Sequence, residues 1–200
     1  MVFRRGGILK RNEKWYFKGK QLEVISFYKY LGIMFTPKLK WSLARKTLAA
    51  QASKGLGLLY MYNYKCGSLP VDIMLNLFDN MILPILLYGS EVWGYEYCES
   101  IESVHMSFCK RLLGVGTQTP NAAVLFELGR YPVALHYHLR CVKFWLKLLS
   151  MPDSRLPKSS YHMLKALDEQ GRQTWASSVR SLLRSAAGLW LCVDSTGCCK

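Results

Sequence analysis

The sequence predicts a mostly α protein in which a short N-terminal antiparallel β-hairpin segment is followed by a helical bundle. Two observations predict this fold class. Residues 1–36 contain short, alternating, aromatic-rich runs separated by glycine turns, a pattern typical of β-hairpins. From Trp41 onward, apolar residues recur instead at helical spacing. With 200 residues, half of them hydrophobic, the chain is long enough to bury a core.

The β segment is predicted from the spacing of its runs. Residues 13–18 and 21–25 alternate in character and lie two residues apart, which favours a hairpin. Residues 28–35 continue in the same style, and residues 1–5 form a further strand-like run before a Gly-Gly turn. Strands this short cannot bury a core alone, so we expect them to pack on the helices that follow.

The first helices are predicted by apolar periodicity. The helix that begins near Trp41 has a stripe made of Ala44, Leu48, Ala52, Leu56 and Leu59. A second helix is expected over residues 70–88, where Pro84 predicts a kink or an early end. Residues 89–94 are expected to form a turn.

The next helix is predicted by the order of its charges. Glu99 and Glu102 lie at its start, Lys110 and Arg111 at its end, and Gly114 just beyond, as the helix dipole and a left-handed terminal glycine favour. A short helix should then follow Thr119-Pro120 and end near Gly129.

The longest helical signal spans residues 132–150. Almost all of its residues are apolar, so we expect a mostly buried helix with one basic ridge outside, formed by His136, Arg140, Lys143 and Lys147. The ridge has two interpretations, a phosphate-tracking surface and an ordinary solvated face, and the sequence leaves both open.

The C-terminal part is predicted to be partly helical. Residues 151–157 should break the preceding helix, and residues 175–186 carry a clean amphipathic stripe. Residues 188–200 show no periodicity and are expected to form a frayed tail. We therefore expect four regions: a basic β segment (1–36), a helical region (37–150), C-terminal helices (151–187) and a tail (188–200).

Charge is concentrated in the first third of the chain. Residues 1–65 carry 14 Lys/Arg and 2 Asp/Glu, and therefore 12 of the 14 net positive charges. Aromatic side chains interleave with the cations at residues 27–32, a combination typical of surfaces that bind phosphates and stack on bases. Alternatively, the aromatics pack across strands and the lysines protect a sheet edge. Composition alone favours neither.

The sequence lacks the motifs of most enzyme classes. It contains no Gly-rich phosphate loop ending in Lys-Ser/Thr and no nucleophile elbow. His136 and His138 lie two apart on a helix and point away from each other, and the pair Asp168-Glu169 lies at a polar helix end. We therefore expect no catalytic residues here.

Cysteine usage predicts reduced thiols and no metal or cofactor. Seven cysteines fit no disulfide framework, and no secretory signal follows Met1, so we expect a cytoplasmic or nuclear rather than a secreted protein. His105 and Cys109 share a helix face, but a structural zinc site needs four ligands; the C-terminal cysteines 192, 198 and 199 also lack partners. The most apolar stretch, residues 81–88, is too short to cross a membrane.

Residues 28–32, Tyr-Lys-Tyr-Leu-Gly, resemble the FKYLG strand of the reverse transcriptases (RNA-directed DNA polymerases) of non-LTR, LINE-type retrotransposons. Further blocks are similar to the same family in the same order: residues 1–7, 87–94, 108–114 and 127–132. The resemblance covers roughly residues 1–150, and the remainder is compatible only in part.

The resemblance implies that the strand belongs to the primer-grip hairpin beside the polymerase palm, and that the helices form a thumb-like bundle. The candidate grip positions are then Tyr28, Lys29, Tyr30, Leu31 and Gly32, with Tyr28 in place of the family's Phe and Phe27 before it. Candidate phosphate contacts are Lys38, Lys40, Arg140, Lys143 and Lys147. The implied partners are an RNA/DNA template–primer or a single strand, and the N-terminal part of the polymerase.

The sequence departs from the family at the catalytic centre. Polymerisation there uses Mg²⁺ held by aspartates, including an adjacent pair, whereas aspartate occurs here only at positions 72, 79, 153, 168 and 194. The resemblance therefore implies a transposable-element fragment that lacks the fingers and catalytic palm and binds nucleic acid without polymerising. The alternative is a helical protein-interaction module, supported by the apolar helix at 70–88 and the stripe at 175–186.

Overall fold

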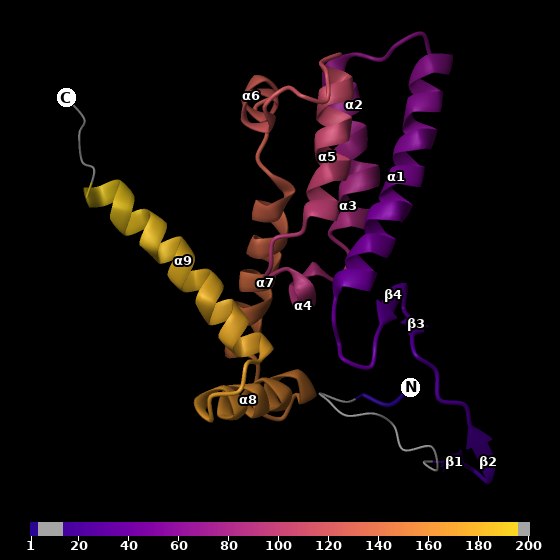
Figure 1. The fold of residues 1–200 in the computed structure, drawn as a ribbon. Helices are drawn as coiled ribbons and strands as arrows, with labels where there is room; N and C mark the ends of the chain where they lie inside the picture. Colours follow the sequence, from indigo (N-terminus) through magenta and orange to yellow (C-terminus); the bar gives the residue numbers. More distant parts are fainter. Residues whose placement is uncertain (4–13, 196–200) are drawn as a thin grey trace. The chain divides into compact units, whose positions relative to one another are not determined.

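The computed structural model describes residues 1–3 and 14–195, and side chains as far as residue 185 (Figure 1). Helices make up 62% of the structure, and short antiparallel hairpins precede them, so the predicted fold class is confirmed. Contacts divide the chain into two compact units. The first unit comprises residues 1–88 and 99–124, and the second comprises residues 89–98 and 125–200.

The β segment of the first unit consists of two hairpins. Strand β1 (Trp15–Phe17) pairs with β2 (Lys20–Leu22), and β3 (Tyr28–Tyr30) pairs with β4 (Ile33–Phe35). In each, the two linking residues have positive φ, 48° and 76° in one and 47° and 84° in the other, as tight hairpins of right-twisted strands require. The first turn thus lies one residue before the position expected from the sequence.

The β segment differs from the expected strands at two places. Residues 28–32 do not form one strand, because β3 ends at Tyr30 and the next two residues, Leu31 and Gly32, form the turn. Of the strand expected over residues 1–5, residues 1–3 are irregular, and residues 4–13 lie outside the described residues.

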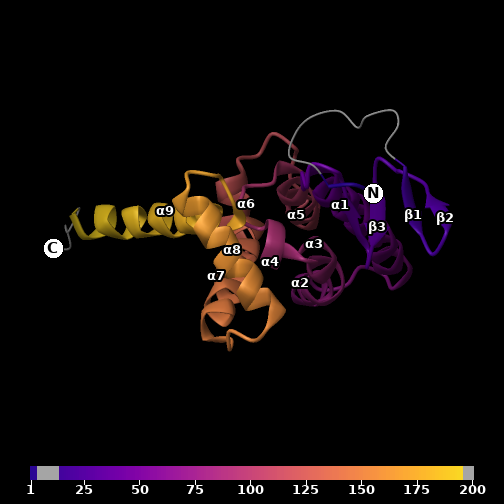
Figure 2. The ribbon, with the colours of Figure 1, turned by 90° about the horizontal axis from the view of Figure 1, so that it is seen from below.

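The helices of the first unit bury the predicted apolar positions. They are α1 (Ser42–Lys65), α2 (Val71–Leu77), the π-helical turn η1 (Phe78–Ile82), α3 (Leu83–Leu86) and α5 (Glu99–Leu112). The boundary between the units falls within α6 (Asn121–Glu127), after Val124. Helix α1 packs against α3 and α5, which lie beside it in both views (Figure 1, Figure 2). The stripe predicted for α1 is buried throughout, and between the helices Phe78 stacks on Phe108 with ring centroids 4.3 Å apart.

The irregularity expected at Pro84 takes the form of η1. Proline has no N–H to donate to the carbonyl four residues earlier, and its ring crowds that carbonyl. The helix adopts one π-helical turn immediately before Pro84, and it ends soon after, at Leu86. The predicted kink or early end is therefore confirmed.

The second unit contains α4 (Ser90–Trp93), α7 (Val133–Ser150), α8 (Leu156–Glu169) and α9 (Trp175–Ser195). The turn expected at residues 89–94 is corrected to the one-turn helix α4. Gly89 has a left-handed conformation, with φ 67°, and the chain turns there. The fully buried Trp93 packs α4 against α7, because its ring lies 5.6 Å from that of Tyr137 between centroids. A tertiary contact thus turns a short polar stretch into helix.

The expectation that α7 is mostly buried is wrong. Its buried residues form a single stripe of Val133, Tyr137, Cys141 and Leu148. Four of its leucines are 42–53% exposed: Leu135, Leu139, Leu146 and Leu149. Within its unit α7 packs against α4, α8 and α9, and these elements cover the buried stripe.

The C-terminal helices pack around Tyr161. This tyrosine and the buried residues Leu148 and Ala176 form a small apolar cluster, and the Trp145 indole donates a hydrogen bond to the Tyr161 hydroxyl at 3.0 Å. The expected tail from residue 188 is corrected, because α9 continues to Ser195; a single glycine at 188 costs a helix only about 1 kcal/mol. Residues 196–200 lie outside the described part. No helix among the described residues is long and apolar enough to span a bilayer.

Candidate nucleic-acid interface

The register of the second hairpin decides which way its side chains face. Tyr28 pairs with Phe35 and Tyr30 with Ile33, so the two tyrosines share one face, whereas Lys29 lies on the opposite face with Met34 as its partner. The sequence left this facing open, because a slip of one residue would exchange the two faces. Phe27 precedes the strand and is also exposed.

The hairpin is anchored at both ends. At the strand end, the Phe35 ring contacts Trp41, with centroids 5.8 Å apart. At the tip, the Tyr88 hydroxyl donates a hydrogen bond of 2.8 Å to the carbonyl oxygen of Leu31. A Cβ added at Gly32 would lie 3.5 Å from the Tyr88 ring, so the tip rests directly on that ring. Sequence reasoning missed Tyr88, because 57 residues separate it from Leu31 and no local pattern links them.

The side chains predicted for the grip are exposed. Tyr28 is 50%, Tyr30 57% and Leu31 71% exposed, and Lys29 is also at the surface. The first hairpin likewise exposes Trp15, Tyr16 and Phe17. Exposed aromatic rings beside cations can stack on bases while the cations meet phosphates. The alternative, that the aromatics pack across the strands, stays open, because Tyr30 of β3 contacts Phe35 of β4 edge to face, 6.5 Å between ring centroids, while both tyrosines remain exposed.

Positive charge continues along the chain after the hairpin. Residues 24–71 contain seven Lys/Arg and no Asp/Glu. A tight turn presents the two lysines Lys38 and Lys40 between β4 and α1, where the Thr36 hydroxyl accepts a hydrogen bond of 3.1 Å from the Lys40 N–H. Within the described residues no carboxylate pairs with the ammonium groups of Lys29, Lys38 or Lys40. Their charge is therefore available to an external anion.

The remaining predicted phosphate contacts belong to the second unit. Lys143 and Lys147 are exposed on α7, and Arg140 lies 3.9 Å from the Glu91 carboxylate, which partly neutralises it. Tyr28–Gly32, Lys38 and Lys40 thus belong to the first unit, and Arg140, Lys143 and Lys147 belong to the second.

Titratable groups elsewhere have structural roles. His105 is fully buried beside Phe78, 5.4 Å between ring centroids, and Cys109, four residues further along α5, is also fully buried, so both are core residues. His138 Nδ1 lies 2.8 Å from the carbonyl oxygen of Gly94, and Asp168 pairs with Arg180.

Metal ligands do not gather in the part of the chain that the structure describes. No three His, Cys, Asp or Glu side chains there lie close enough to hold an ion. The four cysteines with described side chains form no disulfide. Cysteines 198 and 199, considered above for zinc, lie outside the described residues.

No protein-family model matches the chain, and no curated protein or solved structure is significantly similar to it. The fold and the site together define a helical protein that carries an exposed aromatic and basic hairpin.

Proposed function

We propose that this chain is the primer-grip and thumb part of a LINE-type reverse transcriptase, and that it binds the backbone of an RNA/DNA template–primer or a single strand without polymerising. One observation carries the proposal. The hairpin at which the sequence resemblance falls exposes Tyr28 and Tyr30 on one face and Lys29 on the other, with unneutralised lysines directly after it. A buried or neutralised hairpin would not support this function.

The chemistry of this surface is suited to a nucleic-acid backbone. Lysine ammonium groups pair with phosphates, and tyrosine rings stack on bases or sugars at about 1–3 kcal/mol for each stacked base. Contacts to phosphate position a strand but carry no sequence information, so binding should be similar for all sequences. Docking of the hairpin tip on Tyr88 holds the backbone of the turn before a strand arrives, which reduces the entropy cost of binding.

Under this proposal the chain itself does not catalyse polymerisation. The chain has five aspartates and no adjacent pair, whereas two catalytic metal ions need closely spaced carboxylates. Under this proposal the Mg²⁺-binding aspartates come from another part of the polymerase.

A salt titration tests the proposal. We expect the full chain to bind a fluorescein-labelled RNA/DNA hybrid, as measured by fluorescence anisotropy. The affinity should fall steeply as the salt concentration is raised from about 25 to about 200 mM. If about four phosphates are contacted, the slope of log K against log salt should be roughly −3 to −4. No binding at the lowest salt, or an affinity that salt does not change, would overturn the proposal.

Two single-charge variants locate the interface. Lys29→Ala should weaken hybrid binding by roughly three- to fivefold at low salt, equally for different sequences. Lys54→Ala is the matched control, because it removes the same charge from an exposed position of α1 outside the hairpins. It should change the affinity less than twofold. Equal losses in the two variants would show that only net charge matters and would reject the hairpin as the site.

A second candidate, the helical protein-interaction module, is favoured by the four exposed leucines of α7. The same titration separates the two candidates. An interaction module would bind the hybrid weakly or not at all at low salt, and Lys29→Ala would have no effect. A strong and salt-dependent affinity localised to Lys29 would instead favour the polymerase fragment.

A further inference from the structure

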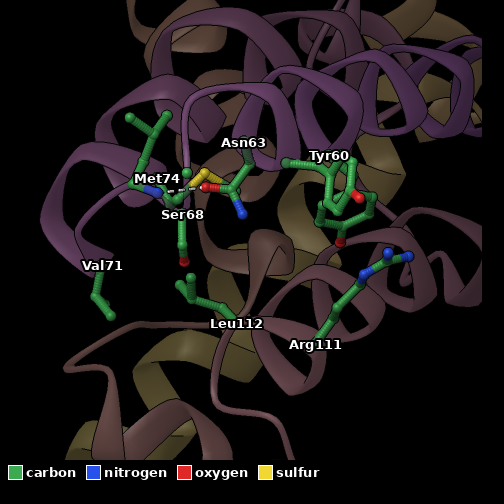
Figure 3. Close-up of a pocket in the computed structure, with 10 residues that line it drawn as sticks. Tyr60, Asn63, Ser68, Val71, Met74, Arg111 and Leu112 are labelled. Carbon is green, nitrogen blue, oxygen red and sulfur yellow. Dashed lines mark hydrogen bonds between the residues drawn. The ribbon is translucent and has the colours of Figure 1, made fainter.

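A cavity of about 550 Å³ opens in the first unit, at the C-terminal end of α1 (Figure 3). Its walls come from the last turns of α1, the loop to α2, the start of α2 and the end of α5. This volume is within the usual range of small-molecule sites. The hairpins lie by the other end of α1, whose 24 residues span about 36 Å. The cavity is therefore separate from the proposed grip.

Arg111 is held in place at the edge of the cavity. Its guanidinium carbon lies 4.0 Å from the centroid of the Tyr60 ring, so the planar group stacks on that ring. No carboxylate or carbonyl of the described residues bonds to its N–H groups. A guanidinium that is already oriented and has open donors is suited to bidentate binding of a phosphate.

Further polar groups converge on the same space. The Asn63 side-chain oxygen accepts a hydrogen bond of 2.7 Å from the Leu69 N–H, which turns its NH₂ group away from that bond and leaves two donors for a ligand (Figure 3). The Tyr60 hydroxyl is buried, and no group in the described residues bonds to it. A buried hydroxyl without a partner is costly, and a bound ligand can relieve that cost.

An aromatic surface and an apolar floor complete the cavity. Tyr64 lines it and is 87% exposed, so most of its ring is open for stacking. Val71, Met74 and Leu112 contribute apolar surface. Tyr64 and Arg111 line the same cavity, so one ligand can contact both of them.

The electrostatics favour an anion. Arg111 is the one charged residue among those that line the cavity. The C-terminal ends of α1 and α5 both lie here, and their dipoles oppose an anion by a few tenths of a kcal/mol each. The last carbonyls of α1 already accept bonds from the N–H groups of Cys66, Gly67 and Ser68, and Lys65 is in its last turn. Arg111 is therefore the charged side chain that a bound anion would meet.

We propose that this cavity binds a single nucleotide unit, with its phosphate on Arg111 and the Asn63 amide and its base against Tyr64. The site does not depend on the grip function, because the hairpin contributes no residue to it. The nucleotide can be a free mononucleotide or the phosphorylated end of a strand, since both present the same phosphate and ring.

Calorimetric titration of the full chain with UMP, uridine and inorganic phosphate tests the proposal. UMP should bind saturably, and uridine and phosphate should each bind at least tenfold more weakly. Arg111→Lys keeps the charge but loses the planar fork, so it should weaken UMP binding about tenfold. Lys54→Ala removes a charge from an exposed position of α1 outside the cavity and should change UMP binding less than twofold.

The other outcomes overturn the proposal. Uridine binding as tightly as UMP would show a site without phosphate recognition, and phosphate binding as tightly as UMP would show a simple anion site. Equal losses in Arg111→Lys and Lys54→Ala would also reject it. Lys29→Ala should leave UMP binding unchanged, so a failure of hybrid binding and a failure of UMP binding can be told apart. Competition by a 5′-phosphorylated trinucleotide, but not by its unphosphorylated form, would identify the strand end as the natural source.

Discussion

Replacement of Gly94 by alanine tests the packing of α4 on α7. Gly94 is buried at the end of α4, and its N–H donates a hydrogen bond of 2.7 Å to the carbonyl oxygen of Ser90. A Cβ built on this glycine would lie 2.4 Å from that same oxygen and 2.6 Å from the carbonyl oxygen of Tyr137. Both neighbours are backbone atoms, so no side chain can rotate out of the way.

The expected cost follows from these distances. Carbon and carbonyl oxygen atoms in close contact normally lie about 3.3 Å apart. The methyl group therefore needs roughly 0.7–0.9 Å of extra separation on two sides, so the last turn of α4 must open at Ser90 and the turn must move away from Tyr137 of α7. Overpacking of this kind costs about 3 kcal/mol, or roughly a 100-fold change in the opening equilibrium.

Hydrogen exchange measured by mass spectrometry is the suitable assay, because it resolves the two units. In Gly94→Ala the peptides that cover α4 and α7 should exchange roughly 100-fold faster. Gly57→Ala is the matched control, since a Cβ there meets nothing within 4 Å and Gly57 is exposed within α1. It should stabilise α1 by about 0.5–1 kcal/mol. Unchanged protection of α4 and α7 in Gly94→Ala would refute the described packing.

Three further experiments, two on variants and one on the unaltered chain, test other parts of the molecule. Tyr88→Phe removes the hydrogen bond to Leu31, worth about 1 kcal/mol, so amide exchange over residues 28–35 should accelerate roughly fivefold; an unchanged rate would contradict the anchoring. At pH 8 iodoacetamide should modify the exposed Cys66 at least 100-fold faster than Cys141, because burial raises the pKa of the Cys141 thiol to about 11; similar rates in peptide mass spectra would refute this. Phe78→Leu, at a fully buried position, should lower the unfolding free energy by about 1–2 kcal/mol in urea titrations, and a loss below a few tenths would contradict its core role.

Local patterns predicted several elements correctly. The stripe of α1 repeats at 3.6-residue spacing, and every member of it is buried in the structure. The charge order of α5 and the left-handed glycine after it, Gly114 at φ 66°, also agree with the prediction. Such features depend on neighbours within a few residues in the chain, so the sequence is sufficient to predict them.

Features that depend on distant partners were not predictable. The sequence shows that α7 is apolar apart from one basic ridge, but only the tertiary contacts decide that one stripe, which includes Tyr137 and Cys141, is covered. The helix α4 exists because Trp93 packs on Tyr137, 44 residues further along the chain. The docking of the hairpin on Tyr88 and the stacking of Arg111 on Tyr60 likewise join segments far apart in sequence.

The sequence by itself therefore determined the fold class, the helical periodicity and the concentration of cations near the hairpins, because each depends on local spacing or composition. The tertiary structure decided which face of β3 carries Tyr28 and Tyr30, since strand pairing sets the register. It also decided that Lys29, Lys38 and Lys40 have no carboxylate partner among the described residues. A charge acts on an external ligand only when no internal group neutralises it, and that depends on where the folded chain places its acids.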